Sequence, residues 1–183
     1  MTKATPLATP LSLPDAEQLC LKLADMMRPD IDTETALIGI HTGGVWVAKR
    51  LHAALGLKTP LGSLDVSFYR DDFGRTGLHP HLHPSDIPFD VTDRPIIIVD
   101  DVLYTGRTLR AAMNEIFDYG RPARIDLAVL VDRGGRELPI HPQWAAHTMQ
   151  VDAKKNLQLE QDEETKAVTP SAASKLTLRL RDY

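Results

Sequence analysis

The sequence predicts an α/β fold, a parallel sheet flanked by helices, and three observations support this prediction. Near-continuous apolar runs occupy residues 36–40, 95–99 and 125–131, as expected for strands that are buried on both faces. Apolar residues recur at helical spacing over 45–55 and 109–117, which is typical of helices that cover a sheet. Strands and helices therefore alternate along the chain, and this order is characteristic of a parallel sheet with crossover helices.

Helix boundaries are marked by residues that favour starts and stops. A helix over 16–27 follows the segment 12–15, Ser-Leu-Pro-Asp, which is typical of a helix start. Pro29 is expected to stop it, because the residue before a proline is disfavoured in helical geometry. Gly56 and Gly120 are well placed to end the two later helices, since glycine adopts the backbone conformation found after a last helical turn.

The remaining segments carry weaker signals. Residues 64–69 are expected to form a further strand, and two more polar strands are expected at 150–160 and 175–180. Residues 70–89 are rich in Asp, Gly, His and Pro and show no sustained period. A loop of this length inside a compact domain is usually functional or disordered, so we expect a long mobile loop there.

A single domain is expected over residues 13–183, preceded by a loose tail at 1–12. A chain of 183 residues is long enough for one domain with a sizeable core and short for two. The one cysteine, Cys20, permits no internal disulfide, which fits a cytoplasmic protein. The tail lacks the apolar core of a signal peptide, and no apolar run approaches the roughly 20 residues that span a bilayer. We therefore expect no membrane association.

A polar string follows the apolar run at 95–99. It starts with Asp100-Asp101 and leads to Thr105-Gly106-Arg107-Thr108, where a helix begins. Backbone N–H groups at a helix start bind anions such as phosphate, and Gly106 lets the backbone approach such a group closely. The carboxylates are suited to accept hydrogen bonds from ribose hydroxyls and to attract hydrated Mg²⁺. Two solvated aspartates before an ordinary capped helix are the plainer alternative, but the ordered string is far more specific and predicts a sugar-phosphate site.

Residues 96–108, IIIVDDVLYTGRT, resemble the phosphoribosyl-diphosphate motif of the type I phosphoribosyltransferases. The Leu-Tyr-Thr-Gly-Arg-Thr form is close to that of the PyrR family, which combines regulation of pyrimidine operons by attenuation with uracil phosphoribosyltransferase activity. The similarity continues with LAVLVDRGGRELPI at 127–140 and with shorter matches upstream. It covers about residues 13–160 in the same order, so chance is a poor explanation.

The resemblance implies a type I phosphoribosyltransferase fold with a small hood built from the N- and C-terminal parts. It implies that Asp100 and Asp101 hold the ribose hydroxyls and, through water or substrate, Mg²⁺. These two residues and Arg70, in the flexible loop, are the catalytic candidates. Asp132 and Arg133 are candidates for binding the base, with a salt bridge or a turn as the alternative. The expected phosphoribosyl diphosphate and nucleotide contacts are Thr42, Gly43, Gly44, Val99, Asp100, Asp101, Val102, Leu103, Tyr104, Thr105, Gly106, Arg107 and Thr108.

The activity implied by the resemblance is that of a uracil phosphoribosyltransferase, a glycosyltransferase. Uracil and 5-phosphoribosyl 1-diphosphate would give uridine monophosphate (UMP) and diphosphate, with Mg²⁺ as cofactor. Regulation of pyrimidine genes by UMP-dependent binding of an mRNA leader is the second implied role, in a dimer or tetramer of identical chains. Two alternatives stand beside this reading, namely an RNA-binding attenuator with weak or no catalysis and a purine-base phosphoribosyltransferase. The string at 131–140 favours the two PyrR-like readings over purine salvage.

Two positions depart from the family pattern, and the overall charge adds a further constraint. PyrR-like chains usually carry Arg where this sequence has Gly43, so a natural diphosphate contact is missing unless Arg70 or Arg75 supplies the charge. They often carry His where this sequence has Gly135, a change expected to alter the hood or RNA contacts. The net charge of −4 argues mildly against a dedicated nucleic-acid binder, so RNA binding rests on the resemblance alone.

Overall fold

The computed structural model describes residues 12–66, 84–162 and 174–183. The predicted mobile loop lies mostly outside these ranges, as do Arg70, Arg75 and nearly all of the N-terminal tail. The elements, in chain order, are α1 (Ala16–Met27), the short 3₁₀ helix η1 (Arg28–Asp30), β1 (Ala36–Ile40), α2 (Gly43–Leu55), β2 (Gly62–Leu64), β3 (Pro95–Leu103), α4 (Arg107–Tyr119), β4 (Arg124–Asp132), β5 (Trp144–Thr148), β6 (Lys155–Gln161) and β7 (Leu176–Asp182).

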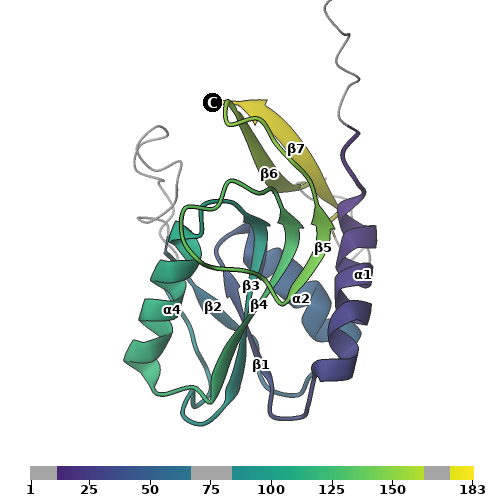
Figure 1. Cartoon of the computed structure of the whole chain (residues 1–183). Coiled ribbons are helices and arrows are strands. Elements are labelled where there is room, and N and C mark those ends of the chain that lie inside the picture. The colour runs from purple at the N-terminus through teal and green to yellow at the C-terminus, as the bar shows by residue number, and fades with distance from the viewer. Residues whose placement is uncertain (1–11, 67–83, 163–173) are drawn as a thin grey trace, which may run out of the picture.

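Five strands form one parallel sheet in the order β2-β1-β3-β4-β5. The central strand β3 pairs with β1 on one side and with β4 on the other, so that Ile98 lies between Ile38 and Leu127. Helices α1 and α2 cover one face of this sheet and α4 covers the other (Figure 1). The predicted α/β architecture is thus confirmed.

Alternation along β3 explains why its sequence is a continuous apolar run. Ile97 and Val99 belong to the buried cluster beneath α1 and α2, whereas Ile96 and Ile98 belong to the cluster beneath α4. Successive side chains of a strand point to opposite faces of the sheet. Both faces of β3 are covered by helices, so every position in the first half of the strand is apolar.

Strands β6 and β7 form a separate antiparallel pair, which we call the hood. The hood stands above the carboxyl ends of the parallel strands (Figure 1). Its apolar face, with Leu157, Leu159, Leu176 and Leu178, packs into the cluster beneath α1 and α2. The two hood strands come from the C-terminal part of the chain, and α1, from the N-terminal part, packs against β7 as well as against α2 and β5.

Some predicted boundaries are wrong for identifiable reasons. The strand expected at 95–99 continues to Leu103, because β4 is long enough to pair with it up to Asp132. Of the strand expected over 64–69, residues 67–69 lie outside the described residues; the observed strand β2 ends at Leu64, where its partner β1 ends at Ile40. The strand expected from residue 150 starts at Lys155, since a turn closed by the bond from Lys155 N to Asp152 O precedes it.

The helix expected over 16–27 is confirmed as α1, and one strand was missed. Asp15 caps α1, and its carboxylate accepts a hydrogen bond of 3.1 Å from Gln18 N. Strand β5, from Trp144 to Thr148, was not predicted. Within the described residues no helix is both long and apolar enough to cross a bilayer.

Candidate active site

The acidic pair lies in the last part of β3, at the carboxyl edge of the sheet. Asp100 is buried, and one of its carboxylate oxygens accepts a hydrogen bond of 3.1 Å from Asp101 N. Ligands of open α/β sheets bind at this edge, where the loops that follow the strands gather. The two carboxylates are held by strand pairing to β4 and therefore have a fixed place beneath the loops β1–α2 and β3–α4.

The loop between β3 and α4 has the features of an anion site. Gly106 precedes the first residue of α4 and has a φ of 93°, a left-handed conformation that favours glycine. The Thr105 hydroxyl is buried and accepts a hydrogen bond of 3.2 Å from Arg107 N. Other N–H groups of the first turn of α4 have no partner within the helix, and the helix dipole favours negative charge there.

The first two residues of α2, Gly43 and Gly44, pack against β3. A Cβ atom on Gly44 would lie 2.4 Å from the carbonyl oxygen of Val99 and 3.1 Å from Asp100 Cα. The start of α2 therefore packs directly on the backbone that carries the acidic pair, and only glycine allows this approach. The peptide bond between His41 and Thr42 in the loop between β1 and α2 is cis.

Gly43 faces the second aspartate. A Cβ atom at this position would lie 2.4 Å from Asp101 Oδ2 and 2.5 Å from its Cγ. The Asp101 carboxylate thus occupies the space that a side chain at residue 43 would enter. A larger residue here, such as the arginine expected from the resemblance, would require Asp101 to rotate.

A cavity of about 160 Å³ opens between these loops and the hood. The acidic pair and both loops line its floor, and β6 lines the opposite side. Trp46, from the first turns of α2, also reaches it. The lining residues are Ile40, Thr42, Gly43, Trp46, Asp100, Asp101, Val102, Tyr104, Thr108, Arg133, Asn156, Leu157, Gln158, Leu159 and Tyr183.

The two candidate base-binding residues have different surroundings. Arg133 lines the cavity although only 2% of the residue is exposed. Its guanidinium lies 4.0 Å from the centroid of the Tyr104 ring, and Nη2 donates to the carbonyl oxygens of Asp152 (3.2 Å) and Lys155 (2.9 Å). Its Nε is buried without a partner in the described part of the chain. Arg133 therefore joins the loop after β3 to the hood.

Asp132 lies outside the cavity lining and is engaged by its own segment. Both carboxylate oxygens accept hydrogen bonds from Arg136 Nη2, at 2.7 and 2.6 Å, and Oδ1 also accepts one from Gly134 N at 3.0 Å. The ion pair between Asp132 and Arg136 is the arrangement that the sequence left as the alternative to a base contact.

The segment after β4 contacts the loop between β3 and α4, which we call the anion loop. The sequence did not predict these contacts. Arg136 donates to the Tyr104 carbonyl, and Glu137 forms an ion pair with Arg107. The N–H groups of Glu137 and Leu138 both donate to Thr105 O, at 3.0 and 3.1 Å. These contacts couple the segment that follows β4 to the loop between β3 and α4.

Gly135, the second position expected to depart from the family pattern, lies against Tyr104. Its φ is 72°, and a Cβ atom there would lie 2.4 Å from Cε2 of Tyr104. The Tyr104 ring thus lies close to the Gly135 backbone as well as to the Arg133 guanidinium. A larger side chain at residue 135 would have to displace this ring.

The expected contact residues fall into two groups. Eight of the candidates line the cavity: Thr42, Gly43, Asp100, Asp101, Val102, Tyr104, Thr108 and Arg133. Six others lie outside the cavity lining: Gly44, Val99, Leu103, Thr105, Gly106 and Arg107. Trp46, Asn156, Gln158 and Tyr183 were missed: Trp46 reaches the site from the start of α2, and the other three reach it from the hood or the residue that follows it. Arg70 lies outside the described residues.

The donors at the floor suit a hard divalent cation shared with a substrate. Asp100 and Asp101 offer carboxylate oxygens, the ligands that Mg²⁺ prefers. No group of three or more metal-ligating side chains occurs in the described ranges. The residues present therefore fit a Mg²⁺ ion that completes its shell with water and substrate oxygens.

Comparisons with known proteins agree on the family and the fold. The family model described as "Phosphoribosyl transferase domain" matches residues 11–163. "Bifunctional protein PyrR" of Pseudomonas entomophila is 49% identical over 153 residues, which are 81% of this chain and 89% of the relative. The protein of the same name from Pseudomonas fluorescens is 44% identical over 176 residues, or 94% and 98% of the two chains.

Solved structures with the same fold include two further phosphoribosyltransferases. A purine phosphoribosyltransferase from Pyrococcus horikoshii has a TM-score of 0.55 and 27% identity, covering 73% of this chain and 82% of its own. A hypoxanthine-guanine phosphoribosyltransferase from Bacillus anthracis has a TM-score of 0.61 and 20% identity, covering 78% and 86%. At 20% identity, the similarity to the Bacillus anthracis enzyme shows a shared fold and nothing more.

Proposed function

Because the chain belongs to the phosphoribosyl transferase domain family and, within it, to the PyrR family, we propose that it transfers the phosphoribosyl group of 5-phosphoribosyl 1-diphosphate to uracil. The products are UMP and diphosphate. The observation that carries this proposal is the single cavity into which the acidic pair and the anion loop both open, beneath the hood. A sugar phosphate and a flat base need such a site. It offers oxygen atoms that accept hydrogen bonds from the sugar hydroxyls, N–H and O–H groups that donate to the phosphate, and a cover over the base.

Each loop has a proposed role. Asp100 and Asp101 accept hydrogen bonds from the ribose hydroxyls, and the segment from Thr105 to Thr108 binds the 5′-phosphate through N–H and hydroxyl donors. The backbone of Thr42, Gly43 and Gly44 faces the diphosphate. Bound Mg²⁺ would supply positive charge that stabilises the leaving diphosphate. Arg70 is proposed as a second source of that charge.

In the reaction, uracil N1 forms a bond to the anomeric carbon as the bond from that carbon to diphosphate breaks. Diphosphate leaves with the bonding electron pair, and the N1 proton is lost to solvent or to Asp101. The anomeric carbon passes through a cation-like state that water would capture. The hood and the loop expected over residues 70–89 are therefore proposed to exclude water. Arg133, with Asp132 beside it, is proposed to bind the base.

A steady-state assay with Mg²⁺ and phosphoribosyl diphosphate tests this proposal, with uracil, hypoxanthine, guanine and adenine offered separately. We expect UMP formation from uracil and its loss in Asp101→Asn. Asp25→Asn is the matched control, because the Asp25 side chain on α1 is 78% exposed. Turnover with a purine base instead of uracil would replace the base assignment. Tight UMP binding without turnover of any base would exclude the enzyme.

The name of the relatives, "Bifunctional protein PyrR", favours a second proposed function. UMP-dependent binding of a pyrimidine mRNA leader would make the chain a regulator as well as an enzyme. Titration of a labelled leader RNA, with and without UMP and at two salt concentrations, tests this role, because phosphate contacts weaken as salt rises. RNA affinity that does not respond to UMP would argue against it. We also propose that the protein is cytoplasmic and forms a dimer or tetramer. Sedimentation of the purified protein would give the number of subunits.

A further inference from the structure

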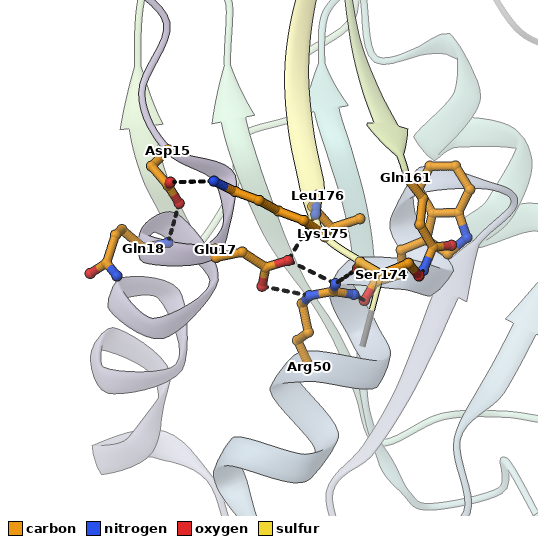
Figure 2. A network of polar contacts seen from close by, with 9 residues as sticks. Asp15, Glu17, Gln18, Arg50, Gln161, Ser174, Lys175 and Leu176 are labelled. Atoms are coloured by element: carbon orange, nitrogen blue, oxygen red, sulfur yellow. Dashed lines mark hydrogen bonds and ion pairs between the residues drawn. The ribbon is translucent and has the colours of Figure 1, made fainter. Parts of the chain in front are cut away.

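The hood strand β6 is held near both of its ends by an arginine from the body of the protein. At the Lys155 end, Arg133 donates to the backbone of Asp152 and Lys155. At the Gln161 end, Arg50 of α2 reaches the chain that leads into β7 (Figure 2). The stretch of β6 that lines the cavity, Asn156 to Leu159, lies between these two attachments.

Arg50 makes four hydrogen bonds that join three parts of the chain. Nε and Nη2 donate to the two carboxylate oxygens of Glu17, both at 2.8 Å. Nη2 also donates to Ser174 O at 2.7 Å, and Nη1 donates to Trp46 O at 3.2 Å. Such a two-pronged contact between guanidinium and carboxylate fixes direction as well as distance. Arg50 thereby relates the hood to α2, whose first turn meets the acidic pair.

Glu17 extends the same network to β7. Its Oε1 accepts a hydrogen bond of 2.9 Å from Leu176 N, the first residue of that strand. Gln161, at the end of β6, donates to the Ser174 hydroxyl, and Asp162 N donates to Lys175 O at 3.0 Å. Figure 2 shows these side chains converging from α1, α2 and the hood. Both hood strands are therefore fixed at the same end.

The arginine of this pair is less exposed than the arginine of an ion pair within the hood, whereas Glu17 and Glu160 are both 33% exposed. The Arg50 and Glu17 side chains are 20% and 33% exposed, whereas Arg179, which pairs with Glu160 across the hood, is 59% exposed. Exposed pairs contribute little to stability because water screens them. A part-buried, hydrogen-bonded pair loses much more when one partner is removed.

We infer that Arg50, through Glu17 and Ser174, is a positioning residue that sets the distance of β6 from the floor of the active site. Trp46, one turn before Arg50 on α2, lines the same cavity and has its carbonyl bound by Arg50. Loss of the Arg50 contacts frees the Gln161 end of the hood while Arg133 still holds the other end. This inference rests on the proposed uracil phosphoribosyltransferase activity, because the base is the substrate expected beneath β6.

The test compares Arg50→Ala, Arg50→Lys and Glu17→Gln with the control Arg179→Ala, in full-length protein with Mg²⁺. For Arg50→Ala we expect the KM for uracil to rise about tenfold. The kcat and the KM for phosphoribosyl diphosphate should stay within about twofold, since the sugar-phosphate loops do not depend on this contact. Arg50→Lys should recover part of the effect, because lysine keeps the charge but lacks the planar donor fork.

Hydrogen exchange gives a readout that does not depend on turnover. In Arg50→Ala and Glu17→Gln, peptides covering β6 and the start of β7 should exchange faster than in the wild type, and in Arg179→Ala they should not. Equal exchange in all variants would overturn the inference even if the wild type failed to use uracil. A KM for uracil no higher in Arg50→Ala than in Arg179→Ala would also overturn it. So would a loss of activity in Arg50→Ala that affects all kinetic parameters equally and matches the loss of folded protein.

Discussion

Replacing Gly44 with Ala tests whether the packing of α2 on β3 holds the acidic pair in place. The added Cβ atom would lie 2.4 Å from Val99 O, against an ordinary contact of at least 3.4 Å, so helix and strand must separate by about 1 Å. Overpacking of this kind costs about 1–3 kcal/mol of stability. A shift of about 1 Å at reacting groups costs about a hundredfold in rate, so we expect kcat/KM to fall by about that factor.

Gly56→Ala is the matched control for this experiment. Gly56 follows α2 with a φ of 67°, and a Cβ atom there would meet nothing within 4 Å. Backbone strain should lower the free energy of unfolding by about 1 kcal/mol, but the site lies at the other end of the helix. Urea unfolding and steady-state kinetics on both variants separate the two effects. A Gly44→Ala protein with wild-type kcat/KM per folded molecule would refute the reasoning.

Three further outcomes follow from single contacts. Arg136→Ala leaves the largely buried Asp132 carboxylate without its partner and should lower the free energy of unfolding by about 3 kcal/mol, measured in urea. The Arg50 hydrogen bonds hold the pKa of Glu17 below its ordinary value of 4.5. The stabilisation is therefore complete above that value and is lost as pH falls through the lowered pKa, so the stability difference between wild type and Glu17→Gln should shrink in acid. Burial raises the pKa of the Cys20 thiol to about 12, so alkylation at mildly basic pH should label this single cysteine in urea and spare the native protein.

The sequence predicted the central part of the fold because β1 and the middle of β3 and β4 are buried at consecutive positions. Both faces of these stretches are covered, so their apolar runs are unbroken, and the helices between the strands have clear apolar stripes. Strand β5 escaped prediction because its pattern alternates between buried and half-buried residues over only five positions. The end of β3 was misplaced because Asp100 and Asp101 are polar residues within a strand, retained there by pairing with β4.

The site was predictable where one contiguous string supplies it and not where distant segments meet. The string from Asp100 to Thr108 identified the floor of the cavity. The opposite wall comes from Asn156 to Leu159, whose polar and apolar alternation resembles that of any half-exposed hairpin. The contact of Arg136 with the Tyr104 carbonyl likewise depends on the path of the chain after β4, beside the loop that follows β3, and spacing in the sequence cannot report it.

The separate sheet of the hood has a consequence for the order in which parts of the molecule lose structure. An isolated pair of antiparallel strands is marginally stable in water, so β6 and β7 depend on their attachments to the body. Local openings can require less free energy than global unfolding, and opening of the hood would expose its four buried leucines and break the contacts of Arg50 and Arg133. The hood can therefore detach while the five-stranded sheet stays intact. A bound nucleotide that touches both would raise the free energy of this opening, and release of product would then proceed at the pace of a partial unfolding.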